Sequence, residues 1–310
     1  MGDKQIKGNR NGTFSSSLGF VIACVGSAVG LGNIWMFPYR VGQYGGAAFL
    51  IPYLLFTFLF GWVGLSGEFA IGRLARTGTI GSYEYCFARR GRKKLGAALS
   101  WIRLLGALVI AIGYAVILGW VLRSLAGSVT GELLTADVEA FFHQASGSFG
   151  SVPWHVAIVV LVGLVLMFGV TKGIEKVSKV LMPLFFGLFL ILAVWVAFLP
   201  GAAEGYKFLF VPEWRALLRV DTWVMAMGQA FFSLSITGSG MIVYGAYLGK
   251  EADIPRASLR TALFDTLAAL LSGLAIMPAV FAYGVDVTRD RKSTRLNSSH
   301  TDISRMPSSA

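Results

Sequence analysis

The chain has 310 residues, of which 55% are apolar and only 14% are charged, and its mean hydropathy is +0.67. Soluble domains carry about a quarter charged residues, so this composition excludes a soluble enzyme, a disordered protein and a disulfide scaffold. The 27 basic and 16 acidic residues leave a net charge of +11. Because the basic residues lie between long apolar runs, we assign them to cytoplasmic loops and expect no nucleic acid as a partner.

Several stretches are long and apolar enough to be transmembrane helices, which need roughly 20 residues. They cover residues 15–38, 44–71, 98–125, 153–171, 177–199, 222–247 and 257–284. The sequence therefore predicts an all-α integral membrane protein with multiple membrane passages. Its expected parts are a cytoplasmic N-terminus (1–14), a transmembrane domain (15–287) and a Ser-rich basic tail (288–310), which we expect to be non-native or disordered.

The loops between these stretches predict the orientation. The loop at 72–97 holds a single acid, Glu84, against Arg73, Arg76, Arg89, Arg90, Arg92, Lys93 and Lys94. The loop at 126–152 holds Glu132, Asp137 and Glu139 and no Lys or Arg. Since basic loops stay in the cytoplasm, we predict a cytoplasmic N-terminus in the plasma (inner) membrane. The basic loop is either this topological signal alone or also a surface for lipid headgroups.

Two of the stretches carry small and polar residues at their centres. The first contains Gly26-Ser-Ala-Val-Gly30-Leu-Gly32-Asn33, and the sixth contains Ser233-Leu-Ser-Ile-Thr-Gly-Ser-Gly240. Such a segment either packs closely against a neighbouring helix or unwinds around a ligand. Two interrupted segments separated by intact ones favour a transporter built from repeated helical units, with its binding sites at the breaks.

One carboxylate lies inside the seventh stretch. Asp265 stands among apolar residues, and a mid-membrane carboxylate costs at least ~2.5 kcal/mol unless it is paired or bound to a cation. It is either a functional group or an acid near a helix end beside Arg260. The two cysteines, Cys24 and Cys86, lack metal-ligand spacing, so we predict two free thiols.

Several motifs resemble those of the neurotransmitter:sodium symporters, specifically their prokaryotic amino-acid branch. They are Gly26–Pro38 (GSAVGLGNIWMFP), Gly45–Tyr53 (GGAAFLIPY), Thr171–Lys176 (TKGIEK) and Gly228–Ser235 (GQAFFSLS), and the likeness covers residues 14–286. The resemblance implies the five-helix inverted-repeat symporter fold, with helices one to seven of twelve present and helices one and six unwound mid-membrane.

The resemblance also implies a function, which is sodium-coupled symport of an amino acid by the full-length protein. Because helix eight and its neighbours are missing, we expect this chain alone to be inactive. The alternative is a non-transporting, membrane-embedded fragment that binds an amino acid. An enzyme is not expected, since no nucleophile–base or metal-ligand spacing occurs. The oligomeric state is left open.

The family's ligand positions can be carried over residue by residue. Two sodium sites are implied, one of them largely present, with ligands at Gly26, Ala28, Val29, Asn33, Ser233 and Asp265. Gly26 and Val29 belong to the second site, whose remaining ligands lie on helix eight. Much of the family has an asparagine where Asp265 stands. A fixed negative charge there replaces the charge that chloride supplies elsewhere, so chloride is not expected.

The implied substrate site surrounds the same breaks. It comprises Ala28, Gly30, Leu31, Gly32, Ile110, Tyr114, Phe232, Ser233, Ser235 and Gly238. Monoamine carriers have an aspartate where Gly30 stands, so an amino acid is favoured over a monoamine. Gly238 replaces a phenylalanine of a leucine carrier, which favours an aromatic or large aliphatic amino acid.

The gates depart from the family pattern. Met36 stands where the outer-gate arginine is usual, which leaves Gln229 with Tyr114 and Phe232 as the outer lid. Arg10 and Tyr247 are candidates for the inner gate. Glu68 resembles an acid that bonds to the broken part of helix six, or is an acid lying near Arg73.

Overall fold

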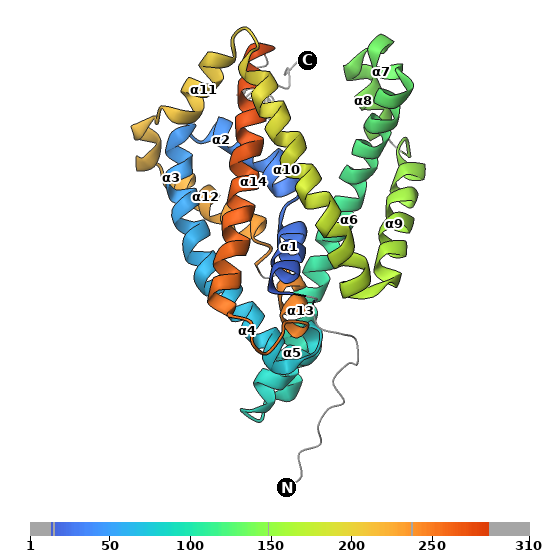
Figure 1. Cartoon of the computed structure of the whole chain (residues 1–310), viewed down its shortest axis with the longest axis vertical. Helices are drawn as coiled ribbons and strands as arrows, with labels where there is room; N and C mark the ends of the chain where they lie inside the picture. Colours follow the sequence, from blue (N-terminus) through green and yellow to red (C-terminus); the bar gives the residue numbers. More distant parts are fainter. Residues whose placement is uncertain (1–13, 15, 148, 237, 285–310) are drawn as a thin grey trace, which may run out of the picture. The chain divides into compact units, whose positions relative to one another are not determined.

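The computed structural model describes residues 14, 16–147, 149–236 and 238–284 (Figure 1). In this part the regular secondary structure is helical, with one isolated bridge between Gly46 and Pro212. The elements up to residue 135 are α1 (Ser17–Ala28), η1 (Gly32–Met36), α2 (Phe37–Gln43), α3 (Ala47–Leu59), η2 (Phe60–Leu65), α4 (Ser66–Ala75), α5 (Thr79–Ala88), α6 (Lys93–Thr130) and α7 (Glu132–Thr135). The remaining elements are α8 (Val138–Ser146), α9 (Val152–Met167), η3 (Val170–Ile174), α10 (Glu175–Ala197), α11 (Ala202–Phe210), η4 (Trp214–Leu218), α12 (Val220–Ser233), α13 (Gly240–Ala246) and α14 (Ile254–Ala282). The all-α prediction is confirmed.

Among the described residues, four helices are long and apolar enough to cross a membrane, and a bent pair makes a fifth span. The four are Ala47–Ala75, α6, α10 and α14, and the bent pair is Ser17–Ala28 with Gly32–Gln43. The other two predicted stretches are helical but differ from the expectation. Helix α9 has 16 residues and ends at Met167, before the predicted 171, because Gly169 has a φ of +75°. The sixth stretch is divided into α12 and α13.

The described residues fall into two compact units. The first unit takes the chain up to Ala23, Glu68–Val180 and Thr237–Ala252, and the second takes Cys24–Gly67, Leu181–Ile236 and the chain from Asp253. The chain passes between the units inside α1, α4 and α10, at the break between α12 and α13, and just before α14. The two broken helices therefore contribute to both units.

Helices α2, α3, α11, α12 and α14 share the core of the second unit. Its centre consists of Phe37, Val41, Phe49, Tyr53, Leu209, Ala226, Ala230, Ala269 and Met277. The turn before α3 is tight, because Gly45 and Gly46 have φ values of +97° and +58°. A β-carbon on Gly46 would collide with the carbonyl oxygen of Phe208. Glycine is therefore needed at position 46 both for its positive φ and for the close approach of α11.

In the first unit, α4 packs backbone to backbone against α13. A β-carbon on Gly72 would collide with the carbonyl oxygen of Ile242. Arg73 donates to the carbonyl of Ala252 over 2.6 Å, and Arg76 donates to the carbonyl of Ala246 over 3.3 Å. These two basic residues, which the sequence placed in a basic loop, thus bind the end of α13 and the segment after it.

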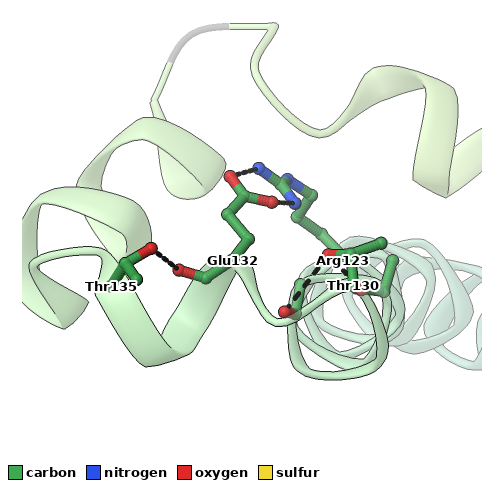
Figure 2. Close-up of polar contacts among 6 residues, drawn as sticks. Arg123, Thr130, Glu132 and Thr135 are labelled. Atoms are coloured by element: carbon green, nitrogen blue, oxygen red, sulfur yellow. Dashed lines mark hydrogen bonds and ion pairs between the residues drawn. The ribbon is translucent and has the colours of Figure 1, made fainter.

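The acidic loop after α6 is folded into α7 and α8. Figure 2 shows the guanidinium of Arg123 facing the carboxylate of Glu132, and two hydrogen bonds of 2.7 and 2.8 Å join them. The same guanidinium lies over the ring of Phe141, 4.4 Å from its centroid. Hydrogen bonding to Arg123 lowers the pKa of Glu132 from its ordinary value. Because Arg123 lies just before the loop boundary, counting loop charges missed its pairing with Glu132.

Both cysteines are free thiols, as predicted: Cys24 is buried and Cys86 is half-buried. The predicted tail at 288–310 and the predicted gate residue Arg10 lie outside the described residues.

Candidate functional site

The first candidate helix is broken where its glycines cluster. Helix α1 ends at Ala28, the wide turn η1 begins at Gly32, and the two halves are bent by 58°. Inside the break, the backbone N–H of Gly30 donates to the side-chain oxygen of Asn33 over 3.1 Å. A backbone group released by the break is thus satisfied by a nearby side chain, which a membrane interior requires. The predicted interruption of helix one is confirmed.

The sixth helix is broken at its serines. Helix α12 ends at Ser233 and α13 begins at Gly240. Ser235 and Ser239 have positive φ values of +52° and +69°, which cost energy for residues other than glycine. Such strained positions cluster at functional sites. The predicted interruption of helix six is confirmed as well.

Three polar side chains converge in the second unit. The side-chain nitrogen of Asn33 donates to the hydroxyl of Ser233 over 3.1 Å and to the carboxylate of Asp265 over 2.9 Å. The same nitrogen donates to the backbone carbonyl of Asp265 over 3.0 Å. The hydroxyl of Ser233 donates to the other carboxylate oxygen of Asp265 over 2.6 Å. All three residues are fully buried. The structure thus brings together three residues that the sequence predicts for one sodium site, and the sodium site itself stays a prediction.

This cluster joins three elements that are far apart in the sequence. Asn33 comes from η1, Ser233 is the last residue of α12, and Asp265 lies near the middle of α14. Asp265 is therefore not an acid near a helix end, and its bonds go to Asn33 and Ser233. The donor set comprises carboxylate, hydroxyl and amide oxygens, which are the hard ligands suited to an alkali cation.

Two further contacts attach the part of helix one that follows the break to α12. The side chain of Gln229 donates to the carbonyl of Gly32 over 2.8 Å. One helical turn earlier on α12, the carbonyl of Met225 accepts a hydrogen bond of 2.9 Å from Arg40. The sequence analysis did not predict a role for Arg40. Its position could have indicated one, because an arginine in the short apolar segment after the break needs a polar partner.

Other predicted site residues lie in the first unit. Ile110 and Tyr114 belong to α6, Gly238 precedes α13, and Tyr247 follows it. The backbone N–H of Phe14 donates to the carbonyl of Tyr247 over 3.3 Å, and their rings lie edge to face with centroids 6.4 Å apart. Tyr247 therefore contacts the segment that follows the predicted gate residue Arg10.

Glu68 has a partner that the sequence did not indicate. Its carboxylate accepts a 2.6 Å hydrogen bond from Arg103 on α6, and the side chains are 9% and 16% exposed. The guanidinium of Arg103 also donates to the hydroxyl of Tyr83 on α5. Arg73, the neighbour considered from the sequence, is bound to Ala252 instead. This buried ion pair connects α4, α5 and α6 within the first unit.

A protein-family model and two known proteins match most of this chain. The model of the sodium:neurotransmitter symporter family matches residues 11–146 and 134–291. The uncharacterized sodium-dependent transporter YhdH of Bacillus subtilis (strain 168) is 39% identical over 276 residues, which are 87% of this chain and 60% of that protein. The uncharacterized sodium-dependent transporter MJ1319 of Methanocaldococcus jannaschii is 33% identical, with 85% and 55% covered.

A solved structure extends the comparison to the fold. The crystal structure of MhsT in complex with L-phenylalanine matches with a TM-score of 0.79 and 38% identity, over 90% of this chain and 63% of that chain. The chain thus spans about 60% of the length of the first two of these proteins and of MhsT.

Proposed function

Since the chain belongs to the sodium:neurotransmitter symporter family, we propose that its protein couples sodium entry to the uptake of an amino acid across the plasma membrane, with the N-terminus in the cytoplasm. The observation that carries the proposal is the buried cluster of Asn33, Ser233 and Asp265 at the break in helix one. The chain covers 60% of YhdH, so the proposed activity is that of the whole protein.

The proposed first sodium site uses this cluster. Its ligands are the carbonyl of Ala28, the side-chain oxygens of Asn33, Ser233 and Asp265, and the carboxylate of the substrate. In the structure the nitrogen of the Asn33 amide faces the Asp265 carboxylate. Because a cation takes oxygen ligands, sodium binding requires the amide to turn and present its oxygen. The carbonyls of Gly26 and Val29 belong to the proposed second site.

The proposed coupling is independent of chloride. Asp265 accepts hydrogen bonds from both Asn33 and Ser233, as an ionised carboxylate does. A fixed negative charge beside the sodium ion makes a mobile anion unnecessary.

An amino acid is the proposed substrate because its carboxylate can complete the sodium site. The backbone amides of Leu31 and Gly32, at the start of the outer half of helix one, would receive that carboxylate. The amine would meet the carbonyls of Ala28 and Phe232 and the hydroxyl of Ser235. Gly30 offers no side-chain acid to an amine. The crystal structure of MhsT with L-phenylalanine supports a substrate with a large hydrophobic side chain, and we further propose that Ile110, Tyr114 and Gly238 select it.

In the proposed mechanism, substrate and sodium bind together because the substrate carboxylate is itself a sodium ligand. Closure of the outer side and opening of the inner side then occur around the breaks, as alternating access requires. Gln229 belongs to the outer side and Tyr247 to the inner side.

The test is binding of radiolabelled L-phenylalanine to the purified chain in lipid nanodiscs, with sodium compared against choline. Binding should require sodium and should persist when gluconate replaces chloride. Asp265→Asn should weaken apparent sodium affinity at least about tenfold. Ser272→Ala is the control, because this buried hydroxyl of α14 donates only within its own helix, to Ala268 over 2.8 Å. Binding that does not depend on sodium would contradict the proposal. Sodium-dependent binding by the chain, with no sodium-driven uptake by the full-length protein in proteoliposomes, would restrict it to a binding role.

A further inference from the structure

A dense group of cations lies on the turn between α5 and α6. It consists of Arg89, Arg90, Arg92, Lys93 and Lys94, all of them exposed, and we call it the basic turn. Its charge is only weakly compensated. Lys93 reaches Glu84 at 3.4 Å, with the two side chains 66% and 32% exposed, and Arg89 donates to the hydroxyl of Tyr85.

The other cations of the basic turn face no acid. Within the described residues, Arg90, Arg92 and Lys94 form no ion pair, and the first turn of α6 contains no acidic side chain. Like charges this close together repel one another. A surface of this kind is complementary to a partner with several negative charges.

The backbone of the basic turn is ordered by its own contacts. The N–H groups of Arg90 and Arg92 both donate to the carbonyl of Phe87 over 3.0 Å. Gly91 has a φ of +70°, and a β-carbon on Gly96 would lie 2.7 Å from the carbonyl oxygen of Tyr83, so α5 and α6 are tightly packed. The cations are therefore presented from a fixed backbone, which lowers the entropy cost of binding.

The position of the basic turn along α6 indicates its depth in the membrane. Exposed apolar side chains begin immediately after Lys94, at Leu95, Leu99 and Ile102, with 44%, 37% and 68% of their surface exposed. Helix α6 is apolar enough to span a bilayer, and only 6% of its span is buried inside the protein. At 1.5 Å per residue, Lys94 lies about 8 Å along the helix from Leu99. This distance places the cations at headgroup level when the apolar side chains lie in hydrocarbon.

We infer that the basic turn docks the phosphate groups of anionic phospholipids. Charge selects the headgroup, and the adjoining apolar face of α6 accepts the acyl chains. This surface is separate from the proposed sodium and substrate sites, so lipid binding can be tested without any transport measurement.

The experiment is native mass spectrometry of the purified chain in neutral detergent, titrated with phosphatidylglycerol or with phosphatidylcholine. The test variant is Arg90→Gln/Arg92→Gln, and the control is Lys207→Gln/Arg215→Gln, which removes two other exposed cations, one from α11 and one from η4. A cation near an anionic surface contributes about fivefold in affinity, so the test variant should bind phosphatidylglycerol about 25-fold more weakly. The control should bind it as the unmodified chain does.

Salt provides a second readout. Raising the salt concentration should weaken phosphatidylglycerol binding to the unmodified chain more than to the test variant, because fewer charges are screened in the variant. Equal melting temperatures in lipid-free detergent would show that both variants fold. Equal affinity of the unmodified chain for the two lipids, or undiminished phosphatidylglycerol binding by the test variant, would overturn the inference and leave the basic turn as a topological signal only.

Discussion

The side-chain amide of Asn33 donates to the carboxylate of Asp265 over 2.9 Å, although the two residues are 232 positions apart in the sequence. The same amide also contacts the hydroxyl of Ser233 and, through its oxygen, the N–H of Gly30. One buried amide therefore connects the break in helix one with the end of α12 and the middle of α14. The shape of the break depends on this side chain.

Replacing this amide should destabilise the fold even without sodium. Asn33→Ala removes one of the two side-chain donors to a buried carboxylate, at an expected cost of about 2 kcal/mol. In sodium-free detergent buffer, the melting temperature should fall by roughly 5 °C. Ser272→Ala should shift it much less, because that hydroxyl bonds only within α14. If the two variants melt alike, Asn33 does not support the break.

The ion pair of Arg103 and Glu68 should behave as a coupled unit. Removing one partner leaves the other charge buried, so Arg103→Gln and Glu68→Gln should each cost about 3 kcal/mol. The double variant should cost clearly less than the sum, because no uncompensated charge remains. Chemical denaturation of the two single variants and the double variant measures the coupling. Strictly additive losses would show that the pair contributes nothing beyond its separate side chains.

Two glycines of α4 should respond in opposite ways to the same substitution. Gly72→Ala forces a methyl group against the carbonyl oxygen of Ile242, so we expect a loss of about 1–3 kcal/mol. Gly67→Ala meets nothing within 4 Å, and alanine favours the helix, so stability should be unchanged or rise by about 0.5 kcal/mol. Melting temperatures of the two variants, measured side by side, test the packing of α4 on α13. Equal losses would argue against it.

The contact between Arg123 and Glu132 should weaken in acid. Its hydrogen bonds lower the pKa of Glu132 in the folded chain, so their stabilisation is present above the ordinary value of 4.5 and is lost as the pH falls through the lower folded-state pKa. Hydrogen exchange in α7, corrected for intrinsic rates, should therefore increase below about pH 4.5. Glu132→Gln should show faster exchange already at neutral pH and little further acid response. An unchanged pH profile in this variant would assign the response to another group.

The membrane character, the α-helical class and the positions of both helix breaks could be predicted from the sequence alone. These properties are local: apolar length defines a span, and clustered Gly, Ser and Asn residues at mid-depth favour unwinding. The sequence also indicated that Asp265 has polar partners inside the protein, because a carboxylate in an apolar stretch requires a partner wherever it lies.

The partners of these residues could not be predicted from the sequence, because they depend on how distant helices pack together. From the sequence, Arg260 was the nearest charge to Asp265 and Arg73 the nearest to Glu68, yet the observed partners are Asn33 with Ser233, and Arg103. The hydrogen bond from Arg40 to a backbone carbonyl of α12 could likewise not be predicted from the sequence. Hydrophobic patterning shows where a residue lies along its own helix. It does not show which distant helices pack against that helix in the folded chain. Once buried, each polar group must form a hydrogen bond with a polar group of the helix that packs against it.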